Sequence, residues 1–80
     1  MKAYVYKVQI HEEEDGRWSV LVPALPGCTS WGYSKDEALR NIQEAVQCHV
    51  EAMLEDGDII PVEKIGGTNI IPSAAVVANI

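Results

Sequence analysis

Apolar and polar positions alternate along the first part of the chain. Within Tyr4–Ile10 every second residue is aromatic or aliphatic, which is the period of a strand with one buried face. The acidic run Glu12–Gly16 ends in an Asp-Gly pair that tolerates the positive φ of a tight turn. Alternation then resumes over Trp18–Val22. These three segments predict a β-hairpin.

A loop with two prolines, Pro23–Gly27, interrupts this pattern because neither proline can donate a ladder hydrogen bond. The aromatic-rich segment Cys28–Tyr33 then predicts a third antiparallel strand. Ser34 and Glu37 match a capping box, in which the Ser34 hydroxyl accepts from the backbone N–H of Glu37 and the Glu37 carboxylate accepts from that of Ser34. A helix is therefore expected to begin here.

The segment after Ser34 has the three- and four-residue spacing of an amphipathic helix. The stripe expected to face the sheet consists of Ala38, Leu39, Ile42, Ala45, Val46, His49, Val50 and Met53. The polar face expected to meet water consists of Arg40, Gln43, Glu44, Gln47 and Glu51. Gly57 follows as a left-handed stop, so the helix is expected to end there.

After the helix, Glu63–Asn69 predicts a turn and Ala74–Ala78 a last strand. The order β-β-β-α-β indicates an α+β fold, with one mostly antiparallel sheet and a single helix on one face. The helix would act as a crossover that returns the last strand to the side of the first. The opposite face, with Leu21, would then lack a cover. Because so small a domain is marginally stable, we predict a dimer or tetramer formed through this face or a sheet edge.

The charge balance narrows the possible partners. Six basic residues against twelve acidic ones give a net charge of −6, which repels phosphate backbones. Direct nucleic-acid binding is therefore disfavoured and a basic protein partner is favoured, although solubility alone is a sufficient reason for the acidity. The chain shows no secretory signal and no long apolar run, so a cytoplasmic location is expected. Its two cysteines form no CxxC pair, and neither a metal nor a cofactor is expected.

Two motifs in these segments are similar to those of a known family. The segment WSVLVPALPGCTSWG at residues 18–32, followed by EALRNIQEA at residues 37–45, resembles the HicB antitoxin family. The Asp-Gly hairpin before the tryptophan and the helix that ends at Asp56-Gly57 fit the same frame. The resemblance extends over about the first three quarters of the chain.

This resemblance implies a fold like a truncated ribonuclease H, in a single HicB-like domain over residues 1–80. It also implies the role of an antitoxin that masks HicA, a small basic toxin that cleaves messenger RNA. Many members carry a DNA-binding segment after this domain. None is expected within residues 1–80, so operator binding is not expected either. An orphan binding module that has lost its toxin is the alternative.

The first predicted strand argues against nuclease chemistry. A ribonuclease H-like site needs converging carboxylates to hold Mg²⁺, beginning with one in this strand, but Tyr4–Ile10 contains none. The resemblance to a nuclease would then be architectural, and the chain is not expected to be an enzyme. A residual hydrolase would have only the acidic hairpin and Glu37 as ligands. Neither histidine is placed for catalysis, and Cys28 is expected to be a small buried side chain.

Carboxylates of the hairpin and rings of the third strand are the candidates for partner binding. Carboxylates at a turn would attract a cationic surface, although such runs are more often solvated turns. Large rings are the usual sources of affinity, although Trp18 is more simply explained as part of the core. Pro23, Leu25 and Pro26 are expected to extend an exposed apolar patch beside the rings. The predicted partner-binding residues are Glu12, Glu13, Glu14, Asp15, Trp31 and Tyr33.

Overall fold

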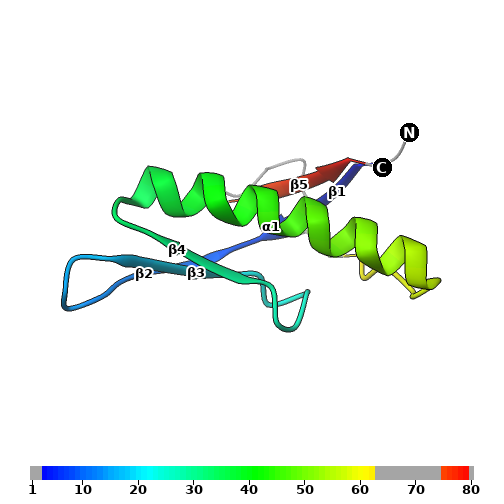
Figure 1. Ribbon diagram of the computed structural model, residues 1–80, viewed down its shortest axis with the longest axis horizontal. Coiled ribbons are helices and arrows are strands. Elements are labelled where there is room, and N and C mark those ends of the chain that lie inside the picture. Colours follow the sequence, from blue (N-terminus) through cyan, green and yellow to red (C-terminus); the bar gives the residue numbers. More distant parts are fainter. Residues whose placement is uncertain (1–2, 63–74, 80) are drawn as a thin grey trace, which may run out of the picture.

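The computed structural model of the chain describes residues 3–62 and 75–79 (Figure 1). Its elements, in chain order, are β1 (Ala3–Lys7), β2 (Gln9–Glu12), β3 (Trp18–Leu21), β4 (Thr29–Gly32), α1 (Lys35–Asp56) and β5 (Ala75–Asn79). The predicted α+β class is confirmed, and one helix serves the strands of the described residues. The turn predicted at Glu63–Asn69 lies outside those residues.

The first predicted strand is two strands, separated at Val8. β1 pairs antiparallel with β5, whereas β2 pairs antiparallel with β3, which in turn pairs with β4. The expectation of one continuous sheet is corrected to two ladders. The return strand is antiparallel to β1, so no parallel crossover forms. The strand is divided because its two halves pair with different neighbours. The half before Val8 pairs with β5, and the half after Val8 pairs with β3.

The core lies between α1 and one face of both ladders. Ala38, Ile42, Val46 and Val50 repeat every four residues and are fully buried, as the sequence predicts. Strand side chains and the loop before β4 complete the buried cluster, which also contains Tyr6, Val20, Val22, Leu25, Cys28, Val76 and Ala78. A fully buried aliphatic side chain stabilises the fold by about 1.5–3 kcal/mol. Figure 1 shows the helix on one side of the strands, and no second helix among the described residues covers the other face.

The helix begins and ends at the residues that its caps predict. The Ser34 hydroxyl accepts from the Glu37 N–H at 3.1 Å, and Gly57, at φ 74°, donates its N–H to the Leu54 carbonyl. One detail of the capping box is different. The Glu37 carboxylate accepts from the N–H of Tyr33 at 2.8 Å rather than from that of Ser34. The same carboxylate therefore ties the start of the helix to the end of β4.

Two glutamines expected in water bind the backbone of β5 instead. The Gln43 amide accepts from the Val77 N–H at 3.0 Å and donates to the Val77 carbonyl. Gln47 makes the same pair of bonds with Asn79, at 2.9 and 2.6 Å. A primary amide has one acceptor and two donors, so it satisfies a strand residue as a neighbouring strand would. The outer edge of β5 is thereby closed by α1.

The edge of β4 is closed from the same helix. The Asn41 side-chain amide donates to the Trp31 carbonyl at 2.8 Å. Two residues further along the chain, the Tyr33 N–H donates to the Glu37 carboxylate. Hydrogen-bonding directions alternate along a strand, so Trp31 and Tyr33 both turn their backbone groups away from β3. α1 thus covers the core face of both ladders and closes one edge of each.

Gly32 sets how closely α1 approaches β4. A Cβ added at this position would lie 2.6 Å from the backbone nitrogen of Ala38 and 3.0 Å from the Cβ of Glu37. Contacts this short with backbone cannot be relieved by turning a side chain. Across the ladder, Gly32 stands opposite Trp18, which packs against the core. The missing side chain is therefore what allows the first turn of α1 to rest on the strand.

Substitution of Gly32 by alanine should destabilise the fold. The added methyl must push the first turn of α1 away from β4, and such overpacking costs about 1–3 kcal/mol or more. Urea denaturation measures the change in the free energy of unfolding. Thr29→Ala, on an exposed position of the same strand, is the control and should cost less than about 1 kcal/mol. Equal costs for the two variants would contradict the close-approach interpretation.

Loss of the Gln43 amide should also cost stability. Gln43→Ala leaves the N–H and carbonyl of Val77 without partners in a partly buried place, for a loss of about 1–3 kcal/mol. The Val77 amide should also exchange faster with deuterium. Glu44→Ala, on the neighbouring exposed position, is the control and should change stability by less than about 0.5 kcal/mol. Unchanged exchange at Val77 in Gln43→Ala would show that the side chain does not close this edge.

Candidate partner-binding surface

The face of the β2–β3–β4 ladder that turns away from α1 carries the exposed large apolar side chains of these strands. Side chains alternate between the two faces of a strand, so Ser19 and Trp31, which are opposite each other in the register, lie on this outer face. Leu21 is 39% exposed, Trp31 46% and Tyr33 72%. This outer face meets the β2–β3 turn, where the acidic run lies.

An ion pair within the turn holds Asp15 and Arg17 together. The Asp15 carboxylate accepts from the Arg17 Nε at 2.8 Å and from the Arg17 backbone N–H at 3.0 Å. The side-chain hydrogen bond from Arg17 is the main reason that the pKa of Asp15 lies below its ordinary value. The same bond raises the pKa of Arg17. Asp15 is therefore ionised and locally neutralised by its own neighbour.

Arg17 also connects the turn to the rings of β4. Its guanidinium carbon lies 5.4 Å from the centre of a Trp31 ring, within the range of a cation–π interaction. Tyr33 meets Trp31 edge-on, with ring centres 5.1 Å apart and planes at 81°. The Trp31 backbone is in turn held by Asn41, and the indole contacts Arg17 and Tyr33 while about half of its surface stays in water. Such a ring is a preorganised contact.

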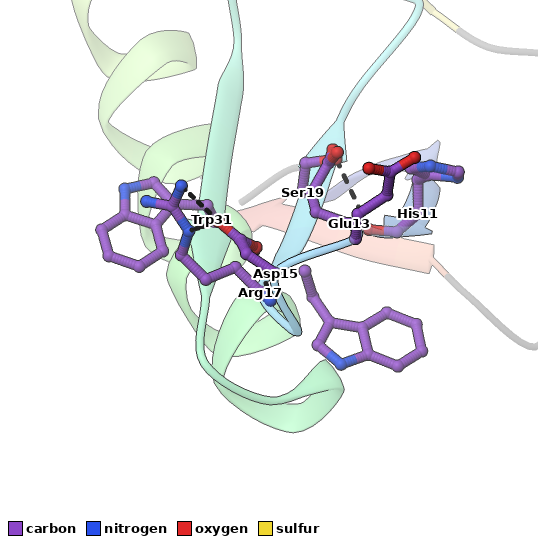
Figure 2. A pocket seen from close by; sticks show the side chains of 8 residues that line it. His11, Glu13, Asp15, Arg17, Ser19 and Trp31 are labelled. Carbon is purple, nitrogen blue, oxygen red and sulfur yellow. Dashed lines mark hydrogen bonds and ion pairs between the residues drawn. The ribbon is translucent and has the colours of Figure 1, made fainter.

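An open cavity of about 660 Å³ lies at this end of the sheet (Figure 2). On one side Glu13 accepts from the Ser19 hydroxyl at 2.8 Å, and on the other Arg17 lies over Trp31. Glu14 has no hydrogen-bond or ion-pair partner within residues 3–62 and 75–79. Its carboxylate is therefore available. The lining residues are His11, Glu13, Glu14, Asp15, Arg17, Trp18, Ser19 and Trp31.

Most of the predicted binding residues meet around this cavity. Glu13, Glu14, Asp15 and Trp31 line it, while Tyr33 does not line it but contacts the ring of Trp31. Glu12 does not line it. Alternation places the Glu12 side chain on the other face of β2, opposite Trp18 in the register. The structure thus gathers the acidic turn and the rings into one surface and leaves Glu12 at its border.

The sequence did not identify Arg17, Ser19 or His11 as part of this surface. Alternation along the hairpin was sufficient to place Arg17 and Ser19 on one face. What no pattern gave was the register of β4 against β3, because a loop with two prolines separates them. That register brings Trp31 opposite Ser19 and under the guanidinium of Arg17.

Comparison with known proteins decides the family. The protein-family model described as "HicB_like antitoxin of bacterial toxin-antitoxin system" matches residues 6–70 of this chain. The chain belongs to the HicB-like antitoxin family. A UPF0150 protein of Thermoplasma acidophilum is 46% identical over 56 residues, which are 70% of this chain and 81% of that protein.

Solved structures of a HicB antitoxin share the fold. The crystal structure of the N-terminal domain of Burkholderia pseudomallei antitoxin HicB superposes with a TM-score of 0.68 at 24% identity, over 99% of this chain and 98% of that one. The structure of the Burkholderia pseudomallei antitoxin HicB gives a TM-score of 0.66, over all of this chain and 64% of that one. At this identity the likeness supports the fold alone.

The prediction of an exposed apolar patch in this HicB-like chain is wrong for Leu25. Leu25 is 1% exposed and belongs to the core, while Pro23 and Pro26 remain at the surface. Two tight turns cause this, because the Leu25 N–H donates to the Val22 carbonyl and the Cys28 N–H to the Leu25 carbonyl. Trp18 is half-buried and packs on the core, as the simpler explanation of this residue had it. The exposed rings of this face are therefore those of β4 and the residue after it.

The described residues of the HicB-like chain offer neither a metal-ligand cluster nor a helix that could span a membrane. Within the described residues, no group of three or more histidine, cysteine, aspartate or glutamate side chains is placed to hold a metal ion. Glu37, which the hydrolase alternative needs, is engaged by the Tyr33 N–H at the start of α1. Across the same residues, no helix has both the length and the apolar character needed to span a bilayer.

The two cysteines of the HicB-like chain lie in different surroundings. Cys28 is 4% exposed, which confirms its assignment as a small buried side chain, whereas Cys48 is exposed on α1. Burial raises the pKa of the Cys28 thiol above its ordinary value, because a thiolate loses its hydration there. Less of Cys28 is therefore ionised at neutral pH than of an unburied thiol.

Alkylation should distinguish the two thiols. The thiolate is the nucleophile, so iodoacetamide near neutral pH should modify Cys48 in the folded chain and leave Cys28 unmodified. Mass spectrometry after proteolysis identifies the modified residue. Cys48→Ser is the control, and it should react only after a denaturant is added. Rapid modification of Cys28 in this folded variant would contradict its burial.

Proposed function

We propose that this chain is the antitoxin of a HicA/HicB-type pair, which acts in the cytoplasm by binding and masking a small basic toxin that cleaves messenger RNA. It would do so as a binding protein, with no reaction of its own. One observation carries the proposal. In this member of an antitoxin family, the half-exposed Trp31 lies beside a turn whose carboxylates are not all paired with cations.

The charge of the surface suits such a toxin. A protein that binds messenger RNA must present cationic groups to the phosphates. The same groups are complementary to a chain of net charge −6 whose acidic run lies at an exposed turn. Glu12 and Glu14 supply this charge, since Asp15 is already paired with Arg17. Exposed carboxylates of this kind would mainly increase the association rate.

Affinity requires contacts that lose water on binding, and the rings provide them. Trp31 and Tyr33 together present a rigid apolar surface, and tryptophan and tyrosine are enriched among the residues that dominate interfaces. Trp31 is held by the guanidinium of Arg17 and, through its carbonyl, by Asn41. These contacts reduce the side-chain entropy that Trp31 loses when a partner covers it, which favours tighter binding.

Self-association is part of the proposal, as a dimer or tetramer, because no described element covers the outer face of the β2–β3–β4 ladder. The second candidate function, an orphan oligomeric binding module, is favoured by the same face, on which Leu21 and Trp31 are both exposed and Leu21 lines an open cavity of about 430 Å³. The two functions differ in the partner. An antitoxin uses the acidic turn on a toxin, while an orphan oligomeric module holds a ligand or another protein on the apolar face.

The direct test mixes this chain with the purified HicA-type toxin of the same genome and follows cleavage of a messenger RNA. We expect cleavage to stop near equimolar antitoxin and a complex to elute on gel filtration. Light scattering on the same column gives the mass of the chain alone and of the complex. Continued cleavage with a molar excess of this chain, and no complex, would refute the antitoxin function and leave the orphan module.

Two variants show whether the proposed surface carries the binding. Trp31→Ala should weaken the complex by about 2 kcal/mol or more, chiefly through faster dissociation. Glu14→Lys should slow association, with an effect that disappears at high salt. Glu55→Lys, near the end of α1, is the control of equal charge change and should have a smaller effect. If Glu55→Lys and Glu14→Lys behave alike, net charge rather than this turn attracts the toxin.

A further inference from the structure

Within residues 3–62 and 75–79, the outer edge of β2 presents backbone groups without partners. The Glu13 N–H donates to the Arg17 carbonyl at 2.7 Å, which places this pair among the hydrogen-bonded positions of the hairpin. Such positions alternate in an antiparallel ladder, so His11 also bonds to β3 while Ile10 and Glu12 turn away from it. Neither Ile10 nor Glu12 has a backbone hydrogen bond on that side within the described residues.

This open edge contrasts with two other edges of the same fold. Gln43 and Gln47 occupy the outward groups of β5, and Asn41 and Glu37 those at the end of β4. All four side chains come from α1. The β2 edge lies near the hairpin turn, and no helix side chain bonds to it. An edge left open is where an extended segment of another chain can add a strand.

The side chains along β2 indicate which strand can be added. Glu12, Glu13 and Glu14 run from the end of β2 into the turn, and none of them forms an ion pair within the part of the chain that the structure describes. A second copy of β2 would bring another acidic run to this edge, and any pairing that sets the two runs opposite each other is destabilised by like charges. A strand with lysine or arginine would gain from the same positions.

We propose that the free edge of β2 accepts an extended strand of a basic protein, through the outward N–H and carbonyl groups of Ile10 and Glu12. The inference rests on the proposed function, and the protein that supplies the strand is the basic toxin. The added strand would extend the ladder in the order added strand, β2, β3, β4. It would lie beside the cavity of about 430 Å³ that Gln9, Ile10 and His11 line, and hence beside the outer face with Trp31.

Glu12→Pro tests the backbone contact. Proline lacks the N–H and places its ring where a partner strand would approach, but the Glu12 N–H takes no part in the β2–β3 ladder. We expect the affinity for the purified toxin to fall about tenfold or more in isothermal titration, as expected when a hydrogen bond and close approach are lost. Glu12→Gln is the matched control, which removes the charge and keeps the N–H, and it should lose less.

Amide exchange supplies a test that needs no variant. In the complex with the toxin, the Ile10 and Glu12 amides of the unmodified chain should become protected from deuterium exchange. In the isolated chain they should exchange rapidly, while the His11 amide is protected by β3. The His11 amide also shows whether Glu12→Pro retains the ladder.

The outcomes separate the inference from the proposed function. A complex in which Ile10 and Glu12 remain unprotected overturns the added strand and leaves the antitoxin function standing, as does an equal loss of affinity in Glu12→Pro and Glu12→Gln. The absence of any complex overturns both. Protection of the two amides in the isolated chain overturns the added strand, because another segment or a second copy then occupies the edge.

Discussion

The fold depends on one stripe of α1 being buried against both ladders at once. Ala38, Ile42, Val46 and Val50 are fully enclosed, and the strands that enclose them come from both ends of the chain. A domain of this size has little apolar surface to bury, so each such side chain is a large share of the net stability. The close approach at Gly32 has the same purpose, since it lets the first turn of the helix reach β4.

The same constraint explains the polar side chains beside the stripe. With one helix for all the strands, the residues next to its apolar face lie close to strand edges, and Gln43, Gln47 and Asn41 bind backbone there. Each satisfies outward backbone groups of a strand, and those that Gln43 satisfies lie in a partly buried place. The helix therefore both buries the core and protects edges that could pair with other chains. This protection does not reach β2.

Periodicity was sufficient to predict what depends on local physics. The hairpin, the cap at Ser34, the left-handed stop at Gly57 and the buried stripe of α1 all follow from spacing and residue type, and all are present. Spacing did not predict the division at Val8 or the bonds of Gln43 and Gln47 to β5. Both depend on which strand lies next to the segment in the folded chain, and spacing along the sequence does not contain that information. For the same reason the acidic run and the rings were recognised, but their union through Arg17 was not. That union needs the register of β3 against β4, which the loop Pro23–Gly27 hides.

Charge and the open edge explain each other under the proposed function. An exposed strand edge risks pairing with copies of itself, and a common defence is to place charges along it. In this chain the charges near the β2 edge are negative, because Glu12, Glu13 and Glu14 follow one another. Arg17, the one basic residue of the turn, is paired with Asp15. These carboxylates repel a second copy of the same edge and attract a cationic strand. The same residues therefore disfavour self-pairing and favour a basic partner. An edge closed by a glutamine, like that of β5, excludes both. The β2 edge can therefore be left open without self-pairing, provided that the partner is basic.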